Sequence, residues 1–417
     1  MTDTKTSAAD VRMHGFARRH TVRAALEWLD AYLRPLESET IPLRDAAGRV
    51  LATPVISAVD VPGFDRATMD GYAVVADDTE GASAYNRVRL KIVGAAMPGS
   101  PFAGAIHRGE TVRIMTGAPM PAATDAVLPA EFVEIDDAGA SIAAISAVSP
   151  AKNVGRRGED ITAGTTVLPA GRILRPQDLG VVSSIGVADA VVVRRPRVRL
   201  VITGNELLPA GTRPHDFVIT DANGPMLAAL IERDGGTVDF PGLVRDEVDA
   251  ILSALNATAD VIVVSGGSSV GVEDLAPMLV AQQGELAVHG IAMRPSSPTG
   301  LGRIGNRLVF LLPGNPVSAL CAYDFFAGRA IRALGGRAKQ WPYRSMRAVL
   351  ARKISSQIGR VDYARVKVEN GRVEPLSVAG ASVLSSTTRA DGFIVIDDDS
   401  EGFPAGVEVE VWLYSIP

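Results

Sequence analysis

The sequence predicts a multidomain chain that combines α/β and β architecture. Three observations support this fold class. The chain has 417 residues, too many for one hydrophobic core, so roughly two to four domains are expected. Residues 197–335 alternate between strand-like and helix-like segments. Short β-rich runs separated by Gly, Pro and Asp occupy residues 40–190 and the region after 340, which is typical of irregular β domains.

A helix is predicted near the N-terminus. Thr21 is a favourable N-cap residue, and Pro35 ends the pattern. Apolar residues recur between them at helical spacing, namely Val22, Leu26, Leu29 and Leu33.

The alternating section predicts a parallel sheet. Its strand-like segments are "RVRLVIT", "DVIVVSG" and "RLVFLLPG", and its helix-like segments are "DANGPMLAALIERDGG", "EVDAILSALNAT" and "LAPMLVAQQ". Strands that alternate with helices form parallel sheets covered by helices on both faces. Ligands bind such sheets beyond the carboxyl ends of the strands.

Four segments at these predicted strand ends are polar or rich in glycine: "VITGNELLPAG", "ITDANG", "SGGSSVGVED" and "LLPGNPVSAL". Glycine-rich turns and helix N-termini offer backbone donors to phosphate. Carboxylates beside a phosphate require a cation between them, which suggests Mg²⁺. The candidate carboxylates are Glu206, Asp246, Glu273 and Asp274. Taken singly, each segment also fits an ordinary strand-to-helix turn, and each carboxylate fits a solvated loop charge.

A second group of unusual segments lies outside the alternating section. "VPGFDRATMDGYAV" spans residues 61–74, "VRIMTGAPMPAATDAVLPAE" spans 112–131, and "GRRGEDI" spans 155–161. A functional cluster is one interpretation. The alternatives are β-turns for the first two segments and a surface ion pair for the third.

Composition excludes several classes of function. A net charge of −5 gives no support for binding nucleic acid or an anionic membrane. The single cysteine, Cys321, and five histidines argue against a disulfide framework, a thiolate metal site or a histidine-rich metal centre. No long apolar stretch or signal peptide is present, so we expect a cytoplasmic protein. No Walker phosphate loop occurs, and "SGGSSVG" lacks the spacing of a dinucleotide-binding turn. The small number of histidines also argues against a hydrolytic triad.

Taken together, the motifs resemble the molybdopterin molybdenumtransferase family, which includes the bacterial molybdenum-insertion enzyme and the E domain of gephyrin. The matching text is "VPGFDRATMDGYAV", "RIMTGAPMP", "RRGEDITAGTTVLPAG", "TGNELLPAG", "SGGSSVGVED" and "LLPGNPVSA", in the family's order over residues 20–415. The resemblance implies a reaction in which adenylylated molybdopterin and molybdate give molybdenum cofactor and AMP, with Mg²⁺. It also implies a homodimer, and as partners a molybdopterin-adenylylating protein and molybdoenzymes or their chaperones.

The resemblance further implies four domains. Residues 15–55 and 153–192 would form a split dimerisation or linker domain, and 56–152 a β-rich domain that contributes to the partner's active site. Residues 193–338 would form an α/β molybdopterin-binding domain, and 339–417 a C-terminal β-barrel.

Site residues are implied position by position. The catalytic set would be Asp70, Thr116, Asp160, Glu206, Asp246 and Asp274, of which the last three would also hold the metal. The substrate-binding set would be Thr203, Gly204, Ser265, Gly266, Gly267, Ser269, Arg294, Pro313, Gly314, Asn315, Pro316 and Arg365.

The sequence departs from the family pattern at several positions. Asn205 replaces an aspartate, and basic residues of the family are replaced at Gly155, Gly290 and Ser297, while Arg294 stands where a lysine is common. Lost cations weaken anion binding. Two alternatives to an active transferase therefore stay open: a paralogue that binds or carries molybdopterin or the finished cofactor, and a pterin- or nucleotide-processing enzyme.

Overall fold

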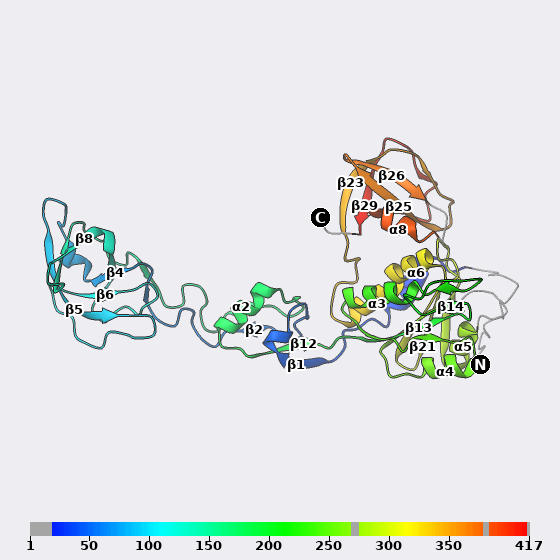
Figure 1. Ribbon diagram of the computed structural model, residues 1–417, viewed down its shortest axis with the longest axis horizontal. Coiled ribbons are helices and arrows are strands. Elements are labelled where there is room, and N and C mark those ends of the chain that lie inside the picture. The colour runs from blue at the N-terminus through cyan, green and yellow to red at the C-terminus, as the bar shows by residue number, and fades with distance from the viewer. Residues whose placement is uncertain (1–18, 268–274, 378–382, 415–417) are drawn as a thin grey trace, which may run out of the picture. The chain divides into compact units, whose positions relative to one another are not determined.

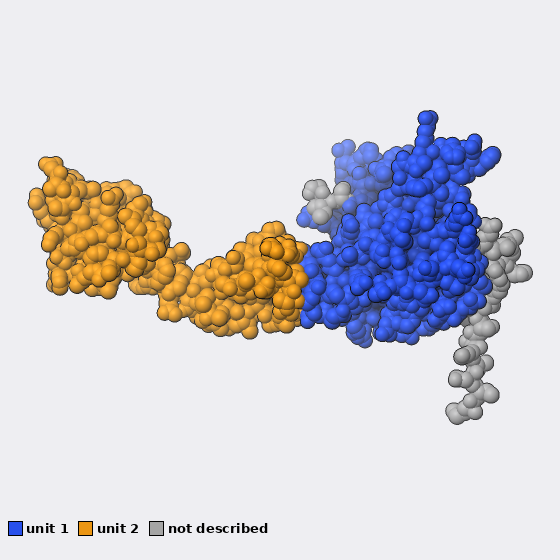
Figure 2. Space-filling model, turned by 60° about the horizontal axis from the view of Figure 1, so that its bottom comes forward, with its two compact units in different colours: residues 1–39, 48–50, 192–417 blue, residues 40–47, 51–191 orange. Residues whose placement is uncertain are grey.

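The computed structural model describes residues 19–267, 275–377 and 383–414 (Figure 1). The chain divides into two compact units (Figure 2). Unit 1 comprises Met1–Glu39, Gly48–Val50 and Val192–Pro417, and unit 2 comprises Thr40–Ala47 and Leu51–Val191. Residues 20–39, which we assigned to the split domain, group with unit 1. The four finer domain boundaries stay a prediction.

Helix α1 (Val22–Asp30) confirms the predicted N-terminal helix. The Thr21 side chain accepts a hydrogen bond from the Ala24 amide at 3.1 Å. The helix ends earlier than predicted because Tyr32 N–H bonds to the Leu29 carbonyl at 3.0 Å, a three-residue spacing that tightens the last turn. Its buried face belongs to the main core of unit 1.

The central sheet of unit 1 is mixed. Its order is β16 (Thr237–Asp239), β13 (Arg197–Thr203), β18 (Val261–Ser265), β22 (Arg307–Leu312), β21 (Gly300–Ile304) and β19 (Glu285–His289), with β17 (Leu243–Val244) also on β13. The strands from β16 to β22 are parallel, as predicted. The expectation of an entirely parallel sheet is wrong for β21 and β19. Gly305 and Asn306 join β21 directly to β22, and so short a connection requires antiparallel strands.

Helices cover both faces of this sheet, as predicted (Figure 1). One core contains residues of α1, α3 (Asn223–Arg233) and the helical run α6 (Pro316–Ala322), η4 (Tyr323–Ala327) and α7 (Gly328–Leu334). The other contains residues of α4 (Val248–Leu255) and α5 (Ala276–Gln283). In β18, Val263 faces the first core, and Val264 faces the second. Within the described ranges, no helix has the length and hydropathy needed to cross a membrane.

The C-terminal part of unit 1 is a closed barrel. Its five strands are β25 (Val361–Glu369), β26 (Arg372–Ser377), β23 (Arg344–Leu350), β29 (Glu408–Leu413) and β27 (Gly392–Ile396), and the pairing of β27 with β25 closes the ring. The short strand β20 (Met293–Arg294) adds to the start of β25. Smaller elements are β24 (Ile354–Ser355), paired with β28 (Gly402–Phe403), and α8 (Ser385–Arg389). The predicted C-terminal β-barrel is confirmed.

Unit 2 contains a six-stranded sheet with the order β7 (Ala126–Pro129), β4 (Gly71–Val74), β6 (Glu110–Ile114), β5 (Val88–Ala96), β9 (Ser141–Ala144) and β8 (Val133–Ile135). Two further pairs are β3 (Arg66–Ala67) with β10 (Val154–Gly155), and β2 (Val55–Ile56) with β11 (Thr166–Leu168). The remaining elements are α2 (Pro176–Ser184) and the 3-10 turns Leu43–Asp45, Ala76–Thr79 and Ala130–Phe132. Strands β1 (Ser38–Pro42) and β12 (Asp189–Val193) lie where the chain passes between units.

A buried carboxylate fixes the start of α2. Asp178 is only 3% exposed, and it accepts hydrogen bonds from Arg172 Nη2 at 2.8 Å and from the Arg175 amide at 2.9 Å. The hydrogen bond from Arg172 is the main cause that holds the pKa of Asp178 well below its usual 3.8. A lowered folded-state pKa stabilises the protein above the unfolded pKa, and that stabilisation is lost as the pH falls through the folded value.

We predict that Asp178→Asn lowers the free energy of unfolding of unit 2 by about 1.5–3 kcal/mol at pH 7, since a charged hydrogen-bond acceptor is lost. Below pH 3.8, the difference in the free energy of unfolding between this variant and wild type should shrink. Calorimetric scans of the unfolding of unit 2 measure this difference. Asp189→Asn, at an exposed site of the same unit, is the control. A difference that stays constant from pH 7 down to about pH 2 would contradict the linkage.

Candidate functional site

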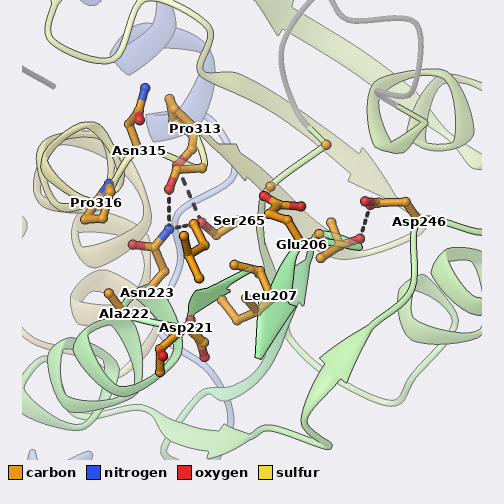
Figure 3. Close-up of a pocket in the computed structure, with 18 of the residues that line it drawn as sticks. Glu206, Leu207, Asp221, Ala222, Asn223, Asp246, Ser265, Pro313, Asn315 and Pro316 are labelled. Carbon is orange, nitrogen blue, oxygen red and sulfur yellow. Dashed lines mark hydrogen bonds between the residues drawn. The ribbon is translucent and has the colours of Figure 1, made fainter. Parts of the chain in front are cut away.

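Three parallel strands of unit 1 end at one cavity of about 610 Å³ (Figure 3). Its lining includes Thr203 and Gly204 after β13, Ser265, Gly266 and Gly267 after β18, and Pro313, Gly314, Asn315 and Pro316 after β22. All of these are residues that the family resemblance implied. The volume suits a small organic ligand.

Gly266 holds two of these strand ends close together. Its φ of +100° lies in the left-handed region, and a Cβ atom there would be 2.0 Å from the Thr203 carbonyl oxygen. No other residue fits this position without a shift of the backbone. Gly267 follows with a φ of +54°. The close approach of β13 and β18 therefore requires glycine at Gly266, whereas a Cβ atom on Gly267 would meet nothing closer than 3.5 Å.

Asn223, the first residue of α3, connects the ends of β18 and β22 (Figure 3). Its Nδ2 donates to Ser265 Oγ at 2.9 Å and to the Gly314 carbonyl at 2.7 Å. The side chain is buried, with 7% of the residue exposed. Because one amide group contacts both strand ends, it fixes the start of α3 against β18 and β22.

Two of the three predicted metal ligands line this cavity. Asp246 accepts hydrogen bonds from Thr203 Oγ1 and, at 3.1 Å, from the Asn205 amide. Glu206 is exposed and also lies in the lining. The third predicted ligand, Asp274, and Ser269 lie outside the described residues. In the part of the chain that the structure describes, no three His, Cys, Asp or Glu side chains group around a possible metal position.

Basic residues are absent from the described lining of the cavity. Arg294 lies in β20, where it forms an ion pair with the fully buried Asp362. Asp362 also accepts hydrogen bonds from Arg360 Nε at 3.0 Å and Ser356 Oγ at 2.9 Å. Arg365 lies in β25 and is 1% exposed. The structure brings neither Arg294 nor Arg365 to the described cavity wall, because β20 pairs with the barrel strand β25.

The other departures from the family pattern have local structural contexts. Gly290 has a φ of +87°, a conformation that a lysine rarely adopts. The Ser297 hydroxyl is shielded from solvent and lies outside the described cavity lining. The Asn205 side chain accepts from the Asp246 amide at 3.4 Å, so this residue interacts with Asp246 through both its backbone and its amide group.

In unit 2, the structure brings the second group of motifs together. Strand pairing places Arg66 opposite Gly155, and Gly117 N–H bonds to the Ala67 carbonyl at 2.8 Å. Asp70 Oδ1 accepts hydrogen bonds from the Thr116 amide and hydroxyl, both at 2.7 Å. The hydrogen bond from the Thr116 amide is the main cause that lowers the pKa of Asp70, and the bond from the Thr116 hydroxyl lowers it further. Asp160 is exposed.

The arginines of "GRRGEDI" form ion pairs with "VPGFDR". Arg156 pairs with Asp65 at 2.6 Å and Arg157 with Asp60 at 2.7 Å. Both arginines thus form surface ion pairs, but with carboxylates of "VPGFDR" and not with the Glu159 and Asp160 of their own segment. A Cβ atom on Gly155 would lie 2.7 Å from Glu159 Oε1, so a larger residue there requires the Glu159 side chain to move.

Sequence reasoning missed the apolar part of the cavity wall. Strand β14 (Leu207–Leu208) pairs in parallel with β15 (Ile219–Thr220), and Leu207, Ile219 and Thr220 all line the cavity. Pro298 lines it as well. The available signal was the position of these residues directly beside predicted polar ones, since Leu207 follows Glu206 in the chain.

Comparison with known proteins agrees with this organisation. Residues 20–186 match the MoeA N-terminal region (domain I and II), 199–333 a probable molybdopterin binding domain, and 347–414 the MoeA C-terminal region (domain IV). Molybdopterin molybdenumtransferase 2 of Mycobacterium tuberculosis is 35% identical over 393 residues, which cover 91% of this chain and 96% of that protein. This chain belongs to the molybdopterin molybdenumtransferase family.

Other members support the assignment. The molybdopterin molybdenumtransferase of Haemophilus influenzae is 32% identical over 388 residues, which cover 90% of this chain and 94% of that one. The crystal structure of a molybdopterin biosynthesis MoeA protein from Pyrococcus horikoshii has a TM-score of 0.82 and 33% identity, and covers 95% of this chain and 100% of its own.

We predict that Gly266→Ala destabilises unit 1 more than Gly242→Ala does. The two glycines have similar φ values, +100° and +105°, but a Cβ on Gly242 meets nothing within 4 Å. Both variants therefore pay the left-handed conformational cost of about 1–2 kcal/mol, and only Gly266→Ala adds a clash with Thr203. Thermal unfolding of both variants measures the difference, and equal losses would contradict the close approach of β13 and β18.

Proposed function

We propose that this chain is a molybdopterin molybdenumtransferase, which inserts molybdate into adenylylated molybdopterin and releases AMP to give molybdenum cofactor. The observation that carries this proposal is the single cavity at which the family's "TGNE", "SGG" and "PGNP" segments meet. Relatives with this name match more than nine-tenths of the chain.

The cavity supplies position and charge for this reaction. The two dithiolene thiols of the pterin displace an oxygen ligand of molybdate, which leaves as water with their two protons, and a water molecule cleaves the phosphoanhydride bond to release AMP. Neither change requires a covalent nucleophile from the protein. The start of α3 lies at the cavity through Asn223, and a helix start favours an anionic group. Orientation and electrostatic stabilisation can supply most of the rate enhancement.

Glu206 and Asp246 are the residues that we propose to hold Mg²⁺, together with Asp274. Carboxylate oxygens are the protein ligands that Mg²⁺ prefers, and one or two of them usually suffice beside substrate phosphates. The donor set fits, because the described cavity lining contains carboxylates but no cation to offset a phosphate. Bound there, Mg²⁺ would neutralise charge on the phosphoanhydride.

We also propose that the protein acts as a homodimer in the cytoplasm, with Asp70, Thr116 and Asp160 serving the partner's cavity. The proximity of Asp70 and Thr116, 2.7 Å apart, supports a shared role for these two residues. A molybdopterin-adenylylating protein would supply the substrate, and molybdoenzymes or their chaperones would receive the product.

Reconstitution tests the proposed activity. Purified protein, adenylylated molybdopterin, molybdate and Mg²⁺ should release AMP and yield a cofactor that activates an apo-molybdoenzyme. Omission of either molybdate or Mg²⁺ should abolish both signals. Tight pterin binding without AMP release would instead indicate a carrier, and AMP release without molybdate would indicate a nucleotide-processing enzyme.

Asp70→Asn should slow AMP release by about tenfold or more if the Asp70 carboxylate serves the reaction. Asparagine keeps an acceptor oxygen for Thr116 but removes the charge. Asp136→Asn is a matched control, since Asp136 is a half-buried carboxylate of unit 2 that also accepts hydrogen bonds from a backbone amide and a hydroxyl, at 2.8 Å and 2.7 Å. Equal rates in the two variants would remove Asp70 from the proposed site.

A further inference from the structure

A second, smaller cavity of unit 1 is lined by three arginines. Its volume is about 10 Å³, and its walls are Gly48–Val50, Arg195, Gly235, Gly335 and Arg337. All of these residues belong to unit 1. Arg195 shortly precedes β13, and Gly235 shortly precedes the parallel strand β16. This cavity therefore lies at the amino ends of the strands, at the opposite edge of the sheet from the larger cavity.

Arg49 brings unused hydrogen-bond donors to this cavity. The residue is 8% exposed, and its Nη2 donates to Glu39 Oε1 and to the Val193 carbonyl. A guanidinium group has further N–H donors on its Nε and Nη1 atoms. Among the described residues, these two atoms of Arg49 have no acceptor. A buried side chain with unpaired donors at a cavity wall favours an acceptor in that cavity.

Arg337 and Arg195 add positive charge to the same place. Arg337 donates to the backbone carbonyls of Arg233 at 3.0 Å and Gly48 at 2.9 Å. Arg195 is exposed. Within the described ranges, no carboxylate forms an ion pair with either residue. Of the three arginines at the cavity, only Arg49 therefore has a carboxylate partner there.

Repulsion among these guanidinium groups acts on Arg337. Burial is the main cause that lowers the pKa of Arg337, and the charges of Arg195 and Arg49 lower it further. Asp234 raises this pKa, but its carboxylate already accepts a hydrogen bond from Arg332 at 2.8 Å. An anion between like charges that are held close together would replace this repulsion by attraction.

A glycine leaves the space that Arg337 occupies. Gly235 has a φ of +92°, and a Cβ atom there would lie 2.8 Å from Arg337 Cζ. Any other residue at this position would strain the backbone and push the guanidinium group away. The turn between α3 and β16 thus holds the Arg337 side chain at the cavity.

We propose that Arg49, Arg195 and Arg337 form a binding site for a small oxyanion of the phosphate class. The cavity has room for about one water-sized group. One oxygen of the anion lies between Arg49 and Arg337, and its other oxygens face Arg195 at the surface. The planar fork of guanidinium donors suits the oxygens of a phosphate.

The bound anion connects Gly48–Val50 to the amino ends of β13 and β16. Its role is therefore to stabilise unit 1. Because this site lies apart from the larger cavity, the inference does not depend on the proposed function.

Thermal unfolding of unit 1 in the full-length protein tests the site, with inorganic phosphate titrated at constant ionic strength. A ligand that binds only the folded state raises the unfolding temperature. We expect phosphate to raise this temperature in wild type. Arg195→Gln should weaken the apparent phosphate affinity by about tenfold or more, because a charged hydrogen bond is lost.

Arg197→Gln is the matched control. Arg197 is an exposed arginine of the same segment and lies outside the lining of the small cavity. This variant removes the same charge and should bind phosphate like wild type. Any general effect of phosphate on stability, or its binding in the larger cavity, is common to all three proteins.

Equal phosphate affinity of wild type, Arg195→Gln and Arg197→Gln would overturn the site, and so would a wild-type protein that phosphate does not stabilise. Equal stabilisation by chloride at the same ionic strength would overturn the oxyanion class. Arg195→Gln should release AMP like wild type in the reconstitution assay. The proposed function therefore stands or falls separately from this site.

Discussion

The close approach of Gly266 to the carbonyl of Thr203 sets the geometry of the cavity. Parallel pairing brings the ends of β13, β18 and β22 to one edge of the sheet, and the missing side chain lets the chain after β18 turn against β13. Asn223 then connects the end of β18 to Gly314. The polar segments that are distant in sequence share one cavity because of these backbone contacts.

The sequence predicted the parts of this arrangement that depend on local pattern. Alternation of apolar strands and amphipathic helices identified β13, β18 and β22, and the glycine-rich text marked their ends. It did not reveal the antiparallel pairing of β21 and β19, because these segments, "GLGRI" and "ELAVH", lack the continuous apolar run of a buried parallel strand such as β18. The short turn at Gly305 and Asn306 was the available signal.

The positions of Arg294 and Arg365 depend on tertiary contacts that no local pattern encodes. Arg294 pairs with Asp362, which lies 68 residues further along the chain, because β20 joins the barrel. The role of Leu207 and Ile219 was missed for a similar reason, since their pairing is apparent only when the loop between them is folded. The sequence motifs thus identified residues near the site, whereas the pairing of strands determined which side chains line it.

Charge is the second determinant of how this site works. The described lining contributes the carboxylates of Glu206, Asp221 and Asp246 and no basic side chain. An anionic substrate therefore requires positive charge from a bound divalent cation, from backbone donors or from another subunit.

The central claim is that this cavity binds the adenylylated substrate. A crystal structure of the protein soaked with AMP and Mg²⁺ tests it most directly. We expect electron density for the phosphate beside Gly266 and Gly267, with the metal ion on Glu206 and Asp246. Nucleotide bound elsewhere, with this cavity filled only by water, would contradict it.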